Sequence, residues 1–500
     1  INSWLVIGTE SKTLKKLLPK EDRFGLEDRS TQGEKGIGRL SAAFLAPVTL
    51  LITKKVNSLF SVALIDWRFF ENPYLSLHDI KVPMAEVQEL SELELEVPLL
   101  ISKLKKHFDS DDKNIKSAWS RYSKEQTLGH TETATSETTE SKIKNFCDNY
   151  RFDKSTLDTW NTLLEKSQEL DGQPHGTALI LLDLSRELGL LSNPQDLAQG
   201  NQELGDIEKS IVDTLRSFYN PFKSDNNSLS YEIKSFGTNY KEKDILRQND
   251  TFNATDFDAL EHKVEGIIDD KGWFKGTVTA FGKSQGEVTI PPSIPIENKG
   301  SYAGHFKIKL GTFEYDEPKS SLDKEQITVF KTTAKKHSGI LIFRDNLRVL
   351  PYGRANHDFF DIEERRGKNA GQYFWANRRT FGNISITSKT NSNLRDKAGR
   401  EGFVINRASR ELRAIVINIL NQLANNYFGG KSDIRREILN IVSKEKEQKK
   451  QAQNKARRIS TKDFTDTLKV QTPKLSENLE KLKKLHLLMT TLTILQKYKN

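Results

Sequence analysis

Three closely spaced glycines near the start of the chain could hold a phosphate group. Gly33, Gly36 and Gly38 form a G-x-x-G-x-G pattern, and a run of helix-forming residues follows at once. Glycine lets the backbone approach a phosphate closely and adopt positive φ. The first turn of the following helix would present free N–H groups and the positive end of its dipole. The segment therefore predicts a phosphate-binding loop that leads into a helix over residues 36–46.

Two other glycine-rich phosphate loops fit this segment poorly. A Walker loop requires G-x-x-x-x-G-K-[ST], which the sequence lacks. A dinucleotide-binding loop has the reverse order, G-x-G-x-x-G, and directly follows a strand. On the residues of this segment alone, a third interpretation stays open, in which the glycines allow a tightly packed helix start that binds nothing.

Two further segments add to the pattern. Residues 4–12 read WLVIGTESK upstream of the glycines, and His175, Gly176 and Thr177 precede the apolar residues 178–182. Together the three segments resemble the GHKL ATPases, a superfamily that includes gyrase, the heat-shock chaperones, histidine kinases and MutL. The closest resemblance is to bacterial MORC-like or chaperone-like ATP-binding proteins. It implies ATP as the ligand and an α+β fold that contains a Bergerat-type α/β sandwich.

The resemblance also implies roles for individual residues. In that family the glycine motif closes the lid over ATP and holds its phosphates. A T-x-S-K segment opens the lid, and a Gly-Thr pair lies under the adenine side of the site. Carried over residue by residue, the nucleotide contacts fall on Thr9, Ser11, Lys12, Gly33, Lys35, Gly36, Ile37, Gly38, Arg39 and Thr177.

Two motifs of the family do not occur before Trp4, where the family pattern would place them. They are a helix with Glu and Asn, which activate water and hold magnesium, and an Asp-x-Gly-x-Gly turn that reads the adenine amino group. The sequence begins with Ile1 and not with Met. We therefore expect both motifs, and the magnesium ligand, upstream of residue 1. Hydrolysis of ATP is then expected of the full-length protein, and residues 1–500 alone are expected to be inactive.

Composition favours a protein of about three domains in a reducing compartment. The 500 residues are 29% charged and 36% hydrophobic, and no apolar run approaches the ~20 residues of a membrane helix. Cys147 is the only cysteine, so no internal disulfide can form, and no Cys/His cluster has the spacing of a zinc site. These features predict a cytoplasmic protein without membrane or zinc.

The pattern of apolar residues and breaks predicts an ATPase domain over residues 1–224. Two strands follow the glycine helix, a helical insertion covers about 95–170, and the ATPase fold resumes with a strand at 178–182. A helix over about 207–218 and a polar break near 224 end the domain. A Thr/Ser/Glu-rich loop is expected over 127–141.

Residues 225–430 are expected to form an α/β transducer-like domain. Strand candidates are 272–279, 287–290, 305–309 and 339–343, and a long helix is expected over 408–427. In the GHKL family, a loop between a strand and a helix of this domain sends a cation to the γ-phosphate. The resemblance implies Lys397 for this catalytic role, with Arg400 and Arg395 next. The alternative is that Arg395 and Arg400 pair with Asp396 and Glu401 on the surface.

Positive charge collects in the C-terminal half. Residues 344–413 carry fifteen Lys/Arg against eight Asp/Glu, and residues 431–458 carry ten against four, while the whole chain has a net charge of +9. This asymmetry indicates an anionic partner, although a solvated helix face would look the same. Basic residues also flank the aromatic residues 373–375, which are expected in the core but could stack on nucleic-acid bases.

The last segment, 431–500, predicts a basic helix followed by a coiled coil. Beyond Pro473, leucines recur at steps of three and four residues, which is typical of a helix-packing seam. They are Leu475, Leu479, Leu482, Leu485, Leu488 and Leu492.

Two functions agree with these patterns. In the first, ATP orders the lid, two ATPase domains associate, and the homodimer closes as a clamp on DNA or on a protein client. In the second, the chain is a scaffold without hydrolysis that is assembled through its C-terminal coiled coil.

Overall fold

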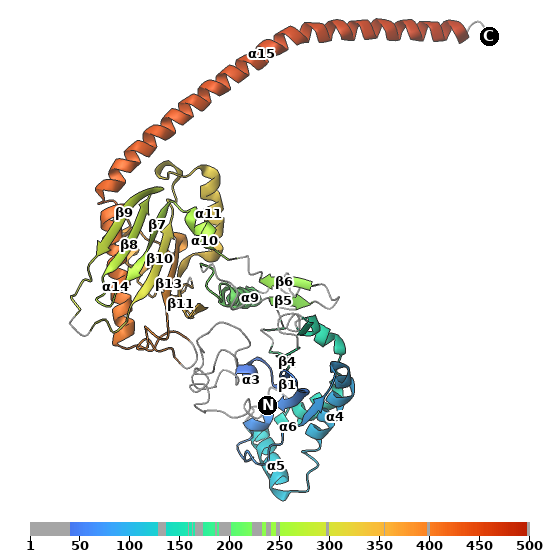
Figure 1. Ribbon diagram of the computed structural model, residues 1–500. Helices are drawn as coiled ribbons and strands as arrows, with labels where there is room; N and C mark the ends of the chain where they lie inside the picture. The colour runs from blue at the N-terminus through green and yellow to red at the C-terminus, as the bar shows by residue number, and fades with distance from the viewer. Residues whose placement is uncertain are drawn as a thin grey trace. The chain divides into compact units, whose positions relative to one another are not determined.

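The computed structural model describes residues 41–128, 137–158, 160–162, 164–165, 174–185, 188–189, 202–222, 233–236, 242–246, 251–296, 300–354, 356–397 and 401–497. Helices and strands are mixed along the chain, which is an α+β protein (Figure 1). The chain divides into two compact units, a first unit of residues 1–218 and 223–251 and a second unit of residues 219–222 and 252–500. The domain boundaries expected near 224 and 430 stay predictions. No helix in the described ranges is long and apolar enough to cross a membrane.

An antiparallel sheet of four strands forms the centre of the first unit, in the order β3-β2-β1-β4. The strands are β1 (Val48–Lys54), β2 (Phe60–Asp66), β3 (Met84–Val87) and β4 (Gly176–Leu182). The first five residues of β1 are buried, as expected of a central strand rich in β-branched and apolar side chains. Strand β4 lies at the edge of the sheet, and its side chains are only partly buried.

Three helices pack against this sheet. They are α4 (Leu93–Lys105), α5 (Lys113–Leu128) and α6 (Thr139–Asn149). Helix α4 buries five apolar side chains at steps of one, three and four residues, and its Leu93, Val97 and Leu100 join the sheet residues in one core. Their spacing follows the helical period, so one face of α4 lies on the core and the other faces solvent. The unit also contains α9 (Gln202–Leu215) and the hairpin of β5 (Ile233–Phe236) and β6 (Glu242–Leu246).

A sheet of seven strands forms the second unit, in the order β12-β11-β13-β10-β7-β8-β9. Only β11 and β13 run parallel to each other; every other pair in this sheet is antiparallel. The strands are β7 (His262–Ile268), β8 (Phe274–Ala280), β9 (Lys283–Ile290), β10 (Phe306–Thr312), β11 (Gly339–Arg344), β12 (Leu347–Arg348) and β13 (Thr380–Ile386).

Helices cover the two faces of this sheet. Helix α14 (Arg407–Leu423) packs its apolar stripe on the face that carries Ile308 and Ile384. Helices α10 (Ala254–Asp258) and α11 (Lys324–His337) share a second, aromatic core with Phe381 (Figure 1). Alternate residues of the same strands therefore reach two different cores, as the period of two in a strand requires.

Two glycines facing each other across β7 and β8 make room for a buried phenylalanine. Gly266 pairs with Gly276, and the ring of Phe274 lies over both. A Cβ on Gly276 would stand 2.2 Å from the carbonyl oxygen of Glu265 and 2.8 Å from the Phe274 ring. Because Phe274 is fully buried, its ring cannot move aside without opening the core.

The chain ends in one long helix, α15 (Asp433–Lys497), with Pro473 inside it. Ile438 and Val442 belong to the core of the second unit, and the ammonium of Lys446 donates to backbone carbonyls of Glu317 and Leu322. Beyond it, the side chains of residues 447–495 are exposed. The basic segment and the leucine segment are thus parts of one helix.

Most expected elements of both units are confirmed, with shifted ends. The strands expected at 178–182, 305–309 and 339–343 are β4, β10 and β11. Asn406 caps α14 by accepting the N–H of Ser409, and the helix ends in a π-helical turn, Ala424–Phe428. The loop expected over 127–141 is wrong at both ends, because α5 extends to Leu128 and α6 begins at Thr139; residues 129–136 lie outside the described residues.

We predict that Gly276→Ala destabilises the second unit by about 1–3 kcal/mol, because the added methyl group overpacks the Phe274 site. Urea unfolding, monitored by hydrogen exchange of the backbone amides in β7 and β8, measures the change in the free energy of unfolding. Gly367→Ala is the control, since a Cβ there meets nothing within 4 Å and alanine is the better helix former. Equal stability of the two variants would contradict the packing argument.

Candidate functional site

Most residues expected to contact the nucleotide lie outside the described residues, and their roles stay predictions. The first element that the structure describes is helix α3 (Ser41–Leu45), which falls within the helix expected after the glycines. The residues outside the described ranges are Thr9, Ser11, Lys12, Gly33, Lys35, Gly36, Ile37, Gly38, Arg39 and Arg400.

Thr177 is the one expected nucleotide contact that the described ranges include. It lies near the start of β4, opposite Thr53 of β1. The two hydroxyl groups are 2.8 Å apart, and Thr177 is exposed. Helix α3 precedes the other end of β1, at Val48. One strand thus connects the end of the glycine helix to the partner of Thr177.

Lys397 and Arg395 lie on a short hairpin-like loop of the second unit. The N–H of Lys397 donates to the carbonyl of Gly402, and the N–H of Val404 donates to the carbonyl of Arg395, both at 2.8 Å. Both basic side chains are exposed. The loop follows β13 and precedes α14, which is the strand-to-helix position expected for it.

Of the alternative surface pairing of this loop, Arg395 forms no ion pair with Asp396 or Glu401, and Arg400 lies outside the described residues. Asp396 instead accepts a hydrogen bond of 3.0 Å from Arg344, a β11 residue that also donates to the carbonyl of Leu394. In the described part of the loop, neither Arg395 nor Lys397 has an ion pair. The buried Arg344 therefore fixes the base of the loop, while its two described cations face solvent.

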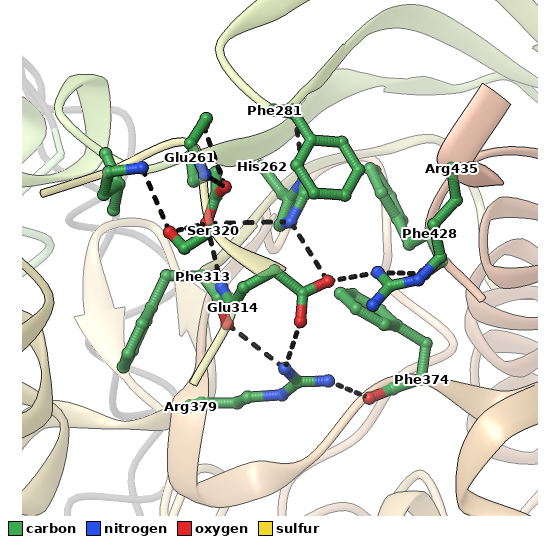
Figure 2. Close-up of polar contacts among 12 residues, drawn as sticks. Glu261, His262, Phe281, Phe313, Glu314, Ser320, Phe374, Arg379, Phe428 and Arg435 are labelled. Atoms are coloured by element: carbon green, nitrogen blue, oxygen red, sulfur yellow. Dashed lines mark hydrogen bonds and ion pairs between the residues drawn. The ribbon is translucent and has the colours of Figure 1, made fainter. Parts of the chain in front are cut away.

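A buried carboxylate, Glu314, connects three parts of the second unit (Figure 2). It follows β10 and forms ion pairs with Arg379, directly before β13, and Arg435, in the first turn of α15. The side chain of Glu314 is 5% exposed and each arginine side chain 12%. Breaking such a pair by removing one partner strands an uncompensated buried charge.

The two arginines have further partners that hold them in place. Arg379 donates to the carbonyl of Phe313 at 3.2 Å, and Arg435 donates to the carbonyl of Phe428 at 2.8 Å. Both guanidinium groups also lie near the ring of Phe374, at 4.4 and 5.5 Å from its centre. The cluster is thus closed by backbone carbonyls and aromatic faces, as the burial of charge requires.

His262 lies against this cluster as a neutral imidazole (Figure 2). Its Nδ1 accepts the N–H of Phe281 at 3.2 Å, so Nε2 carries the proton and faces Glu314 and Glu261 at 3.8 and 4.0 Å. Burial lowers the pKa of His262 well below its usual value, and Arg379 and Arg435 add to the effect. The imidazole is therefore uncharged at neutral pH.

Cys147 has no sign of a catalytic role. Its thiol is buried in the core of the first unit. Burial raises its pKa to about 11, and the nearby carboxylate of Asp66 adds to the rise. The thiol therefore stays protonated at neutral pH and acts as a small core residue.

The aromatic and basic residues around 373–375 have separate places in the fold. Phe374 and Trp375 are buried, and the indole N–H of Trp375 donates to the carbonyl of Leu420 at 2.8 Å. The expectation that these aromatics are core residues is confirmed for Phe374 and Trp375, while Tyr373 is half-buried. Of the flanking arginines, Arg379 belongs to the Glu314 cluster, while Arg366 and Arg378 line a cavity beside α11.

Comparison with known proteins assigns the chain to no family. The chain matches no protein-family model and has no significant match among curated proteins.

We predict that Glu314→Gln destabilises the second unit by about 3–5 kcal/mol, because glutamine keeps the size but leaves two buried arginines without a counter-ion. Urea unfolding, monitored by hydrogen exchange of the backbone amides in β10, β13 and the start of α15, measures the change in the free energy of unfolding. The control is Asp316→Asn in the exposed pair with Lys319, with an expected change below about 1 kcal/mol. If both variants unfold at the same urea concentration, Glu314 does not hold these elements together.

Proposed function

We propose that this chain is an ATP-binding protein of the GHKL class that acts as an ATP-gated dimeric clamp on nucleic acid or on a protein client. The proposal assigns the lid and phosphate loop to residues 9–12 and 33–39, and the Bergerat-type sandwich to the first unit. The α/β second unit takes the transducer role. Its basic segments, 344–413 and 431–458, would face the client.

The observation that carries the proposal is the order of elements around β1. The glycine segment leads to helix α3, the helix leads to β1, and β1 pairs with the strand that begins at Gly176 and Thr177. Thr177 and α3 are near opposite ends of β1. A nucleotide with its phosphates at the helix and its base near Thr177 would therefore extend along this strand.

The described residues fit part of what ATP requires. The exposed hydroxyl of Thr177 can contact a base, and exposed Lys397 is a cation on a loop whose base is fixed by Arg344. When bound, magnesium would neutralise phosphate charge. No group of three or more potential metal ligands occurs in the ranges that the structure describes, and the proposal assigns the magnesium ligand and the general base to none of these residues.

A scaffold without hydrolysis is the second candidate, and helix α15 favours it. The leucines of the predicted seam, from Leu475 to Leu492, are each between 51% and 66% exposed. A row of exposed leucines on one helix is typical of a surface that pairs with another helix. In this function the coiled coil would join two chains whether or not nucleotide is bound.

We predict that a non-hydrolysable ATP analogue converts the full-length protein, extended upstream of residue 1, from monomer to dimer, as measured by sedimentation. Gly36→Val should abolish this shift while the fold is kept, because a side chain at Gly36 would stand where the phosphate approaches. A mass that ignores the analogue would contradict the clamp. A dimer that forms without nucleotide and is lost in Leu482→Glu, but not in Lys483→Glu, would favour the scaffold.

We further predict that Lys397→Ala in the full-length protein slows ATP hydrolysis by about a hundredfold, while ATP binding changes little. The reason is that a cation aimed at the terminal phosphate stabilises charge that develops in the transition state. Single-turnover rates and ATP titration separate the two effects. Lys389→Ala, another exposed lysine before α14, is the control. Equal loss of binding and hydrolysis would assign Lys397 a structural role.

A further inference from the structure

The second unit contains a cavity that the proposed ATP site does not use. Its volume is about 500 Å³, within the usual size of small-molecule sites. It is bounded by α11, by the start of β11, by residues 353–363 and by α12 (Ile362–Lys368). Every lining residue belongs to the second unit.

Two glycines let the walls of this cavity come together. Gly339 starts β11 with φ +127°, and Gly353 has φ +80°. A Cβ on Gly339 would stand 2.4 Å from the carbonyl oxygen of Gly353. Side chains at these positions would force the 353–363 segment away from β11, so the cavity depends on backbone-to-backbone contact.

Positive charge dominates the lining. Five cations contribute to the wall against two carboxylates, Asp358 and Glu363; the cations are Lys331, Lys335, Arg354, Arg366 and Arg378. A concave surface with one sign of charge concentrates its field on a bound ion.

The two carboxylates of the wall are occupied in holding the backbone. Asp358 accepts the N–H groups of Ile362 and Glu363 at 2.8 Å each. Glu363 accepts the N–H of Asn377 at 2.6 Å and lies 3.7 Å from Arg366. Both carboxylates are therefore engaged at the start of α12 and at one arginine, and neither forms an ion pair with Lys331, Lys335 or Arg378.

Three of the cations have no carboxylate within ion-pair distance among the described residues. They are Lys331, Lys335 and Arg378. Lys331 and Arg378 instead both lie near the Tyr315 ring, with the charged groups 4.1 and 5.2 Å from its centre. A ring holds cations in position without neutralising them, so both keep their charge for an anion.

His357 adds a group that responds to pH at the same wall. Burial lowers its pKa, Lys397 and Arg354 add to the lowering, and Asp358 opposes it. The imidazole is thus neutral at pH 7 and can donate or accept one hydrogen bond. Lys397 thus contributes to the electrostatic field at His357.

We propose that this cavity binds a small phosphorylated ligand, whose phosphate groups are held by Lys331, Lys335 and Arg378. Several separate cations suit a polyanion, since a single carboxylate is satisfied by one arginine fork. A volume of about 500 Å³ suits a small molecule, whereas a nucleic-acid strand needs a longer groove that follows its backbone. The inference does not rest on the proposed ATP site, because none of the residues that line the cavity is among those assigned to the nucleotide.

The test is calorimetric titration of the Gly36→Val protein with inorganic pyrophosphate and with ADP. In this background the proposed glycine-loop site is disabled, so the remaining binding reports on the cavity. The pair Lys335→Glu and Arg378→Glu should weaken that binding at least tenfold. The control pair, Lys283→Glu and Lys389→Glu, makes the same change in charge on exposed residues outside the cavity and should change it less than twofold.

Different outcomes separate this proposal from the ATP proposal. Failure of the Gly36→Val protein to bind either probe, or equal binding by both charge-reversed pairs, would overturn the cavity site. Binding of a single-stranded oligonucleotide that is lost in the cavity pair, without binding of pyrophosphate or ADP, would also overturn it and assign the cations to nucleic acid. A nucleotide effect on the wild-type mass that Gly36→Val leaves unchanged would count against the glycine-loop site alone. The Lys335 and Arg378 side chains are exposed, so the thermal unfolding midpoint of the cavity pair should match that of the control.

Discussion

The second unit depends on the need to keep one buried carboxylate neutralised. Glu314 lies between Arg379 and Arg435, and these three residues come from the ends of β10, β13 and α15. An unpaired charge in such a place is far more costly than an unpaired charge on the surface. The ends of the two strands and of the helix must therefore all be in place for these charges to be paired. Glu261 beside it accepts hydrogen bonds from Ser320, Ser321 and the N–H of Glu314, which fixes the segment between β10 and α11 as well.

That constraint also bears on the walls of the cavity proposed as an anion site. Arg379 is adjacent to Arg378 of the cavity, and α11 begins a few residues after the segment that Glu261 holds. The Lys397 loop is fixed separately, through Arg344 and Asp396, yet its charge still reaches His357 in the cavity wall. An anion in the cavity and a nucleotide near Lys397 would therefore act on the same local electrostatic field.

Strands and helices with clear periodicity could be predicted from the sequence, whereas long-range charge pairing could not. The apolar runs at β1, β4 and β11 identify themselves by composition, and Asn406 and Ser409 mark the start of α14 as a capping pair. Glu314 and Arg435 are 121 positions apart, and nothing local to either shows that it is buried. The one local signal for a buried carboxylate was its position next to the end of an apolar strand, as in Glu261-His262 and Glu314. Arg366 and Arg378 stood out as basic residues near aromatics, but Lys331 and Lys335 look like an ordinary solvated helix face until the fold brings residues 353–363 over them.

Helix α15 has a mechanical consequence. Its last contacts with the second unit are at Lys446, and about 75 Å of helix follows at 1.5 Å per residue. A rod held at one end acts as a lever, so a tilt of a few degrees at Arg435 and Lys446 moves the leucine segment by several ångströms. Pro473 removes one N–H from the helical ladder within this arm, which makes it the most compliant point between the anchored end and the leucines. A small change of packing around Glu314 would thereby shift the exposed leucine surface by several ångströms.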